Sequence, residues 1–182
     1  RLPNKSLGVA ISGARNLIGG LMDGEGNLIS GNDGTGLLIE TADAVANTVV
    51  GNLIGTNAAA TAALPNLFSG ISIDGAPDTL IGGSVPEALN LISGNDGAGI
   101  VVANSGATNT VIIGNFIGTD LTGALAIPNN GDGVLINQSA SSTFVGTGNP
   151  GEGNLISGND GAGVAIESGA FGQDADLAPG DY

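Results

Sequence analysis

The sequence predicts an all-β solenoid: a right-handed parallel β-helix with three strands per turn and about five to six turns of 28 to 34 residues. The main observation is a repeat, because Asn-Leu-Ile-Ser-Gly-Asn-Asp occurs at 27–33, 90–96 and 154–160, with starts 63 and then 64 residues apart. Looser copies begin at Asn52 and Asn115, so each long repeat holds two turns. Short apolar runs separated by Gly, Asn and Asp indicate strands joined by tight turns.

The first strand of each turn has alternating apolar residues, which places alternate side chains on one face. These strands are expected to begin at Val9, Leu37, Ile71, Ile100, Val134 and Val164. The apolar residue two positions further on is predicted to form a core ladder: Ile11, Ile39, Ile73, Val102, Ile136 and Ile166. The residue after each of these faces outward.

Two more strands follow in each turn. The second is expected to begin near Asn16, Asn47, Asp78, Asn109 and Ser142. The third is the repeated motif, and its isoleucines are predicted to continue the core ladder: Ile29, Ile54, Ile92, Ile117 and Ile156. The residue before each isoleucine is predicted to point outward, where size is less constrained: Leu28, Leu53, Leu91, Phe116 and Leu155.

A polar column accompanies the third strands. The asparagines that open them are predicted to form a structural ladder: Asn27, Asn52, Asn90, Asn115 and Asn154. A side-chain amide can donate to the next turn and accept from the previous one, so stacked amides satisfy a buried corner along the whole coil. Gly31, Gly94 and Gly158 allow positive φ at the bend that follows.

Residues 1–167 are predicted to be β-helix repeats that begin mid-repeat. Leu-Pro-Asn at 2–4 matches 64–66, and Ile-Pro-Asn at 127–129 is the third copy, so we expect a fragment of a longer array. Residues 168–182 contain no recognisable second strand, and Phe171, Leu177 and Tyr182 suit a C-terminal cap or tail.

The charge is strongly acidic. Seventeen carboxylates oppose only three bases, which gives a net charge of −14, and residues 16–182 contain no Lys or Arg. Nucleic acid and anionic membranes are therefore not expected as partners, since both require bases to neutralise phosphate. No apolar run approaches the roughly 18 residues of a membrane span, so membrane insertion is not expected. The absence of Cys suits an extracellular or cell-surface protein without disulfides.

The repeats resemble the right-handed parallel β-helix proteins of the pectin-lyase-like superfamily. They are most similar to tandem β-helix repeats of large secreted bacterial proteins, whose turns read much like Gly-Asn-Phe-Ile-Gly-Thr-Asp-Leu-Thr-Gly at 114–123. The resemblance covers residues 2–167 and implies the architecture specifically. It implies little about activity, because the superfamily includes lyases, hydrolases, epimerases, adhesins and passive stalks.

The side chains that such enzymes use for chemistry are missing. Lyases of the superfamily use Arg or Lys beside calcium, and pectin hydrolases combine Asp with His and bases, but this chain has no His and no base after Arg15. A carboxylate-only glycosidase at Glu40 and Asp74 is the one catalytic alternative, because these residues occupy equivalent outward positions on adjacent turns. Asp33, Asp96 and Asp160 resemble calcium-binding turns, but two turns separate them, and Asx-turn capping explains them better.

The sequence therefore predicts a non-catalytic structural repeat module of a secreted or cell-surface bacterial protein, acting as a rigid spacer or display scaffold. No cofactor and no metal site are expected. Two alternatives stay open: a carbohydrate-binding or polysaccharide-processing β-helix, and a calcium-stabilised repeat. Self-association through open coil ends or through the outer face of the first sheet is expected, whereas a glycan ligand has no direct support.

Overall fold

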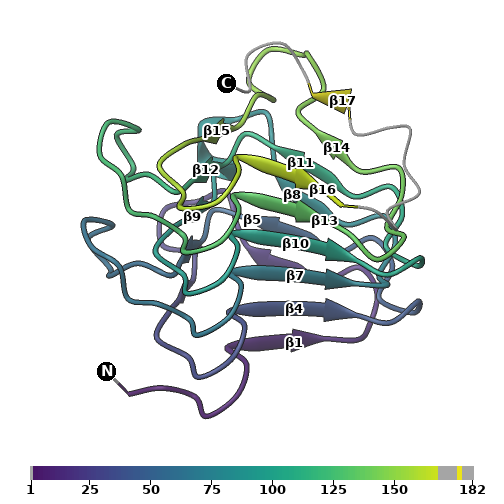
Figure 1. Ribbon diagram of the computed structural model, residues 1–182, viewed down its shortest axis with the longest axis horizontal. Coiled ribbons are helices and arrows are strands. Elements are labelled where there is room, and N and C mark those ends of the chain that lie inside the picture. The colour runs from purple at the N-terminus through teal and green to yellow at the C-terminus, as the bar shows by residue number, and fades with distance from the viewer. Residues whose placement is uncertain (1, 168–175, 178–182) are drawn as a thin grey trace.

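The computed structural model describes residues 2–167 and 176–177. The chain winds into a coil in which each complete turn contributes one strand to each of three parallel sheets (Figure 1). The predicted fold class, a right-handed parallel β-helix with three strands per turn, is confirmed. Among the described residues the one helix is a 3-10 helix, η1 at Pro86–Ala88.

The sheets follow the three strands of each turn in order. Sheet A contains β1 (Val9–Ile11), β4 (Leu37–Glu40), β7 (Ile71–Asp74), β10 (Ile100–Ala103), β13 (Val134–Ile136) and β16 (Val164–Ile166). Sheet B contains β2 (Leu17–Gly19), β5 (Thr48–Val50), β8 (Leu80–Gly82), β11 (Val111–Ile113), β14 (Phe144–Val145) and β17 (Asp176–Leu177). Sheet C contains β3 (Leu28–Ile29), β6 (Leu53–Ile54), β9 (Leu91–Ile92), β12 (Phe116–Ile117) and β15 (Leu155–Ile156).

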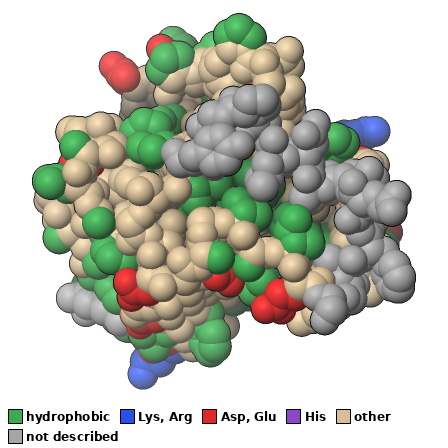
Figure 2. Space-filling model, turned by 45° about the horizontal axis from the view of Figure 1, so that its top comes forward, with side chains coloured by type: hydrophobic (Ala, Val, Ile, Leu, Met, Phe, Trp, Pro, Cys, Tyr) green, Lys and Arg blue, Asp and Glu red, His purple; other side chains and the backbone are tan. Residues whose placement is uncertain are grey.

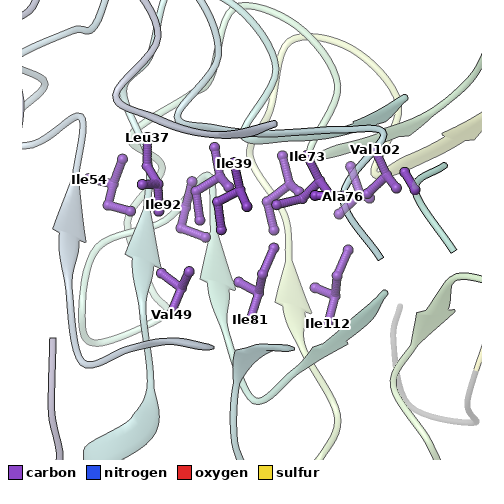
Figure 3. Packing of buried hydrophobic residues seen from close by; sticks show 14 of the residues in the cluster. Leu37, Ile39, Val49, Ile54, Ile73, Ala76, Ile81, Ile92, Val102 and Ile112 are labelled. Carbon is purple, nitrogen blue, oxygen red and sulfur yellow. The ribbon is translucent and has the colours of Figure 1, made fainter. Parts of the chain in front are cut away.

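Equivalent residues stack because neighbouring turns pair in register. Ile39 of β4 pairs with Ile73 of β7, which in turn pairs with Val102 of β10. The same holds in sheet C, where Ile54 pairs with Ile92. Each inward side chain thus contacts an aliphatic side chain of similar size above and below, which forms one continuous core (Figure 3).

The predicted core residues are buried through most of the coil, and the exceptions, Ile11 and Ile166, lie on the first and last strands of sheet A. The inward isoleucines of β6, β9 and β12 are fully buried, as are their counterparts in β4, β7 and β10. Ile11 is only partly buried and packs against the cluster. The prediction for Ile166 is wrong, since this side chain is 48% exposed. Among the described residues it lies on an end strand of sheet A, where β13 is the one strand paired with it.

The outer face of sheet C departs from the prediction at Leu91. Leu28 is 48% exposed, as expected for an outward residue, but Leu91 is completely buried. Long return loops fold back over this sheet, each closed by an antiparallel bridge, Thr56 to Ala63 and Thr119 to Ala126. In the second loop a Cβ at Gly123 would lie 2.6 Å from Leu155, the counterpart of Leu91 one repeat later. Residues of the second return loop therefore pack against the outer face of sheet C.

Strand β17 corrects the expectation that no second strand follows Ile166. Asp176 pairs with Phe144, and Leu177 pairs with Val145, which extends sheet B by one strand. Pairing of this kind uses backbone groups, so it does not require the Asn-Thr pattern that marks the earlier second strands. The predicted cap residues Phe171 and Tyr182 lie outside the described residues.

Candidate functional sites on the coil

The predicted asparagine ladder forms at the corner between sheets B and C. Each side-chain Nδ2 donates to the Oδ1 of the asparagine one turn further on. The donor–acceptor distances are 2.9 Å from Asn27 to Asn52, 3.0 Å from Asn52 to Asn90, 2.9 Å from Asn90 to Asn115 and 3.1 Å from Asn115 to Asn154. The ladder runs without a break through five turns.

Hydrogen bonding in the middle of the ladder uses the full capacity of the side-chain amide, as at Asn52. The Nδ2 of Asn52 also donates to the carbonyls of Ile18 and Val50, and its Oδ1 also accepts the backbone N–H of Asn27 at 3.1 Å. Ile18 lies in β2 and Val50 ends β5, so these bonds tie the ladder to the strands of sheet B. An amide with both donors and both acceptor sites engaged has none left for a ligand, so the ladder serves the structure.

A second asparagine ladder, which the sequence analysis missed, lies at the corner before sheet A. Its members alternate between the Pro-Asn and Ser-Gly-Asn motifs: Asn4, Asn32, Asn66, Asn95, Asn129 and Asn159. Successive side chains are joined by amide hydrogen bonds of 2.7 to 2.9 Å. Both motifs were visible in the sequence, but Ser-Gly-Asn directly follows its third strand whereas a return loop separates Pro-Asn from its own, so their common register was not apparent.

At the third corner, which precedes sheet B, the residue type changes along the coil from asparagine to threonine. Asn16 donates to Asn47 at 2.9 Å in the first two turns. Threonine takes the same register in the next three turns, at Thr79, Thr110 and Thr143. Their hydroxyl oxygens are buried and have no hydrogen-bond partner. An unpaired buried hydroxyl costs stability, so this corner is less well satisfied than the two continuous ladders.

Glu40 and Asp74, the candidate catalytic carboxylates, are Cα partners on β4 and β7. The structure thus brings them side by side at the C-terminal ends of two neighbouring strands of sheet A. The carboxylate of Asp74 accepts a hydrogen bond from the Asn104 amide of the next turn. Neither carboxylate lines the two grooves described below. A hydrolytic pair would also need a site that holds sugar against the two carboxylates.

The aspartates of the Gly-Asn-Asp-Gly turns take part in local hydrogen bonding. Asp96 accepts from the Asn130 side chain at 3.2 Å, and the backbone N–H of Asp160 donates to the Asn129 carbonyl. Within residues 2–167 and 176–177 no group of three or more His, Cys, Asp or Glu side chains could hold a metal ion. The calcium alternative is not tested by this observation and stays a prediction.

Two loop carboxylates have lowered pKa values. Partial burial raises the pKa of Asp120, but hydrogen bonds from the Leu125 amide, the Thr122 hydroxyl and the Ala124 amide outweigh it and hold the pKa below its ordinary value. In Glu152, hydrogen bonds from the Thr147 hydroxyl and the Asn149 side chain lower the pKa. Both carboxylates therefore fix loop conformation in their charged form.

Two grooves lie where loops project between sheets B and C. We define groove 1, about 440 Å³, by the lining residues 20–24, 26–28, Gly51, Leu53, Ala58 and Glu87. We define groove 2, about 240 Å³, by 83–86, Leu89, Gly114, Phe116, Gly151 and Gly153. The loop at 83–89, which contains η1, stands between them and contributes to both.

The grooves are equivalent positions in successive repeats. Leu53 of groove 1 and Phe116 of groove 2 occupy the same place on β6 and β12, two turns apart. Their linings differ in charge: groove 1 includes Asp23 and Glu87, whereas no charged residue lines groove 2.

Met22 in the wall of groove 1 is 71% exposed. The face drawn in Figure 2 carries Asp and Glu side chains, with Lys and Arg only at its margin.

The three register-matched parallel sheets and the asparagine ladders between them define this chain as a parallel β-helix. No family model matches the sequence, and no curated protein matches it. Among solved structures the chain is similar to a double mutant of the periplasmic alginate epimerase AlgG, with a TM-score of 0.64 and 18% identity over 96% of this chain. The match spans 36% of the AlgG chain, and at this identity it shows the fold alone. Within the described residues no helix is long and apolar enough to cross a membrane.

Proposed function

We propose that the chain is a non-catalytic structural module of a secreted or cell-surface bacterial protein, which acts as a rigid spacer or display scaffold. The observation that carries this proposal is the use of the repeated polar side chains. The two asparagine ladders are engaged in bonds between turns, as at Asn90 and Asn129, and these bonds stiffen the coil instead of facing a substrate.

The small number of side-chain types that could act in catalysis supports the same function. General acid–base chemistry in this chain falls to carboxylates, because the sequence has no His or Cys and no base after Arg15. Asp120 and Glu152, the two carboxylates with shifted pKa values, have lowered values and bind their own loops. A general acid at neutral pH needs a raised pKa instead.

The direct test is incubation of the module with a panel of neutral and acidic polysaccharides, with calcium present. We expect no product from any substrate. Product formation that disappears on Glu40→Gln or Asp74→Asn would overturn the proposal, because these substitutions keep the shape of the side chain and remove its charge. Asp96→Asn is the matched control, since Asp96 is an outward carboxylate on another corner that also accepts an asparagine hydrogen bond.

A display scaffold makes a positive prediction as well. The return loops 57–63 and 120–126 project from the coil (Figure 1), and each is closed at its base by an antiparallel bridge. Insertion of a short Gly/Ser peptide between Ala58 and Ala59 should lower the melting temperature only modestly, since it opens the small turn that Asn57 closes with Thr61 but leaves the Thr56–Ala63 bridge at the base of the loop. The same insertion between Leu91 and Ile92 should prevent folding.

Polysaccharide processing is the second candidate function. It is favoured by the likeness to a protein described as an alginate epimerase and by the adjacency of Glu40 and Asp74. The polysaccharide panel separates the two candidates. Calcium stabilisation is separable from both, because a melting temperature that falls on addition of a chelator would reveal it even when no polysaccharide is bound.

A further inference from the structure

Grooves 1 and 2 form a surface that the scaffold role does not require. We propose that they dock an extended, polyproline-II segment of a partner protein, with an apolar side chain in groove 2 and a basic side chain over groove 1. This inference is separate from the proposed scaffold function, which needs no bound partner.

The spacing of the grooves selects the conformation of the segment. Successive turns of a parallel coil lie about 4.8 Å apart, so the floors at Leu53 and Phe116, two turns apart, are separated by about 9.6 Å. A polyproline-II segment has three residues per turn and rises about 3.1 Å per residue, so residues i and i+3 project to the same side about 9.3 Å apart. One such pair reaches both grooves.

The ridge between the grooves disfavours a helical partner. The loop at 83–89 stands between them, with Pro86 and Glu87 exposed on its 3-10 turn. An α-helix spans a similar distance with residues i and i+7, but its residues i+3 and i+4 project from the same face and would meet this ridge. A polyproline-II segment turns its intervening side chains away.

Groove 2 suits an apolar side chain. Val85 is 45% exposed in its wall, Phe116 is half-buried in its floor, and Pro86 and Leu89 complete the apolar lining. Covering these side chains removes apolar surface from water, which favours binding. The lining contains no charged group that would have to be desolvated.

Groove 1 suits a basic side chain with a long aliphatic stem. Its lining combines the apolar side chains of Met22 and Leu53 with the carboxylates of Asp23 and Glu87, and it contains no Lys or Arg. An Arg or Lys can lay its stem on the apolar part and place its charge beside the carboxylates. The net charge of −14 also attracts cationic partners over longer distances.

The test uses fluorescein-labelled proline-rich peptides that hold the polyproline-II conformation, with Leu and Arg three residues apart in either order. We expect one order to bind saturably in fluorescence anisotropy. Its affinity should fall at least tenfold when Glu replaces Arg, because that places a like charge beside Asp23 and Glu87. A two-residue spacing should weaken binding to a similar extent, since the two side chains then project in different directions.

Protein variants locate the binding site. Val85→Asp should weaken binding at least tenfold by placing an unpaired charge against the apolar side chain. Glu87→Gln should weaken it about two- to fivefold, as expected for a solvent-accessible ion pair. Leu125→Asp is the matched control: Leu125 is 67% exposed on a return loop outside both grooves, so binding should not change. Unchanged melting curves establish that the variants fold. Absence of saturable binding by both peptide orders, or equal weakening by Leu125→Asp and Val85→Asp, overturns the proposal.

Discussion

Replacement of Asn90 by Ala tests the asparagine ladder most directly. Asn90 is fully buried in the middle of the coil. Its Nδ2 donates to the Val49 carbonyl at 2.8 Å and to Asn115 Oδ1 at 2.9 Å, and its Oδ1 accepts from the backbone N–H and the Nδ2 of Asn52, both at 3.0 Å. The substitution removes all four bonds.

The expected loss follows from the groups left behind. The backbone N–H of Asn52 and the Oδ1 of Asn115 lose the partners they have in the ladder. A buried polar group without a partner costs about 1–3 kcal/mol, so two such groups imply a loss on the order of 2–6 kcal/mol in the free energy of unfolding. A typical domain has about 5–15 kcal/mol in total, so the coil should unfold at a much lower urea concentration.

The measurement is urea unfolding followed by far-UV circular dichroism. Asn130→Ala is the control, because Asn130 is exposed and donates a single 3.2 Å hydrogen bond to Asp96. We expect that control to lose less than about 1 kcal/mol. Equal midpoints for the two variants would refute the reasoning, since the ladder would then be no more stabilising than one surface hydrogen bond.

Three further predictions concern the core, the threonine corner and one loop. Ile92→Ala and Leu91→Ala should each cost about 2–5 kcal/mol in urea unfolding because both side chains are fully buried; a much smaller loss for Leu91 would mean that the return loop does not cover it. Thr110→Val should leave the melting temperature unchanged or raise it, since the hydroxyl it removes is buried and unpaired; a marked decrease would reveal a hydrogen bond. Asp120→Ala should lower the melting temperature at neutral pH. The lowered pKa means that the stabilisation exists above the ordinary value of 3.8 and disappears as pH falls through the folded-state pKa, so the two melting curves should converge in acid; a constant difference contradicts this.

Local sequence was sufficient to predict much of the architecture because a solenoid repeats one local solution. The alternation in residues 37–40 and 71–74 specifies which side chains face inward, and the repeat specifies which residue lies on the next turn. Stacking then follows without knowledge of any distant contact, as the pairing of Ile54 with Ile92 illustrates. The ladder from Asn27 to Asn154 was predictable for the same reason, since each member opens the same short motif.

Features that depend on loops were not predictable in this way. Leu91 and Leu28 have the same motif and register, yet Leu91 is buried on the middle strand of sheet C between Leu53 and Phe116, whereas Leu28 on the edge strand β3 is 48% exposed. Strand β17 pairs through backbone groups that carry no sequence signature. The grooves likewise arise between loops that lie 63 residues apart in the sequence.

The sequence by itself determined the strand order, the inward residues of the central turns and one asparagine ladder, because these depend on period and on identical neighbours. Tertiary structure alone decided the rest. The common register of Asn32 and Asn66 depends on how the return loop closes, the exposure of Ile166 depends on its place at the end of sheet A, and the grooves depend on how far loops project. The physical reason is that in-register backbone pairing stacks equivalent residues on successive turns. The path of a loop depends instead on the surface against which it packs.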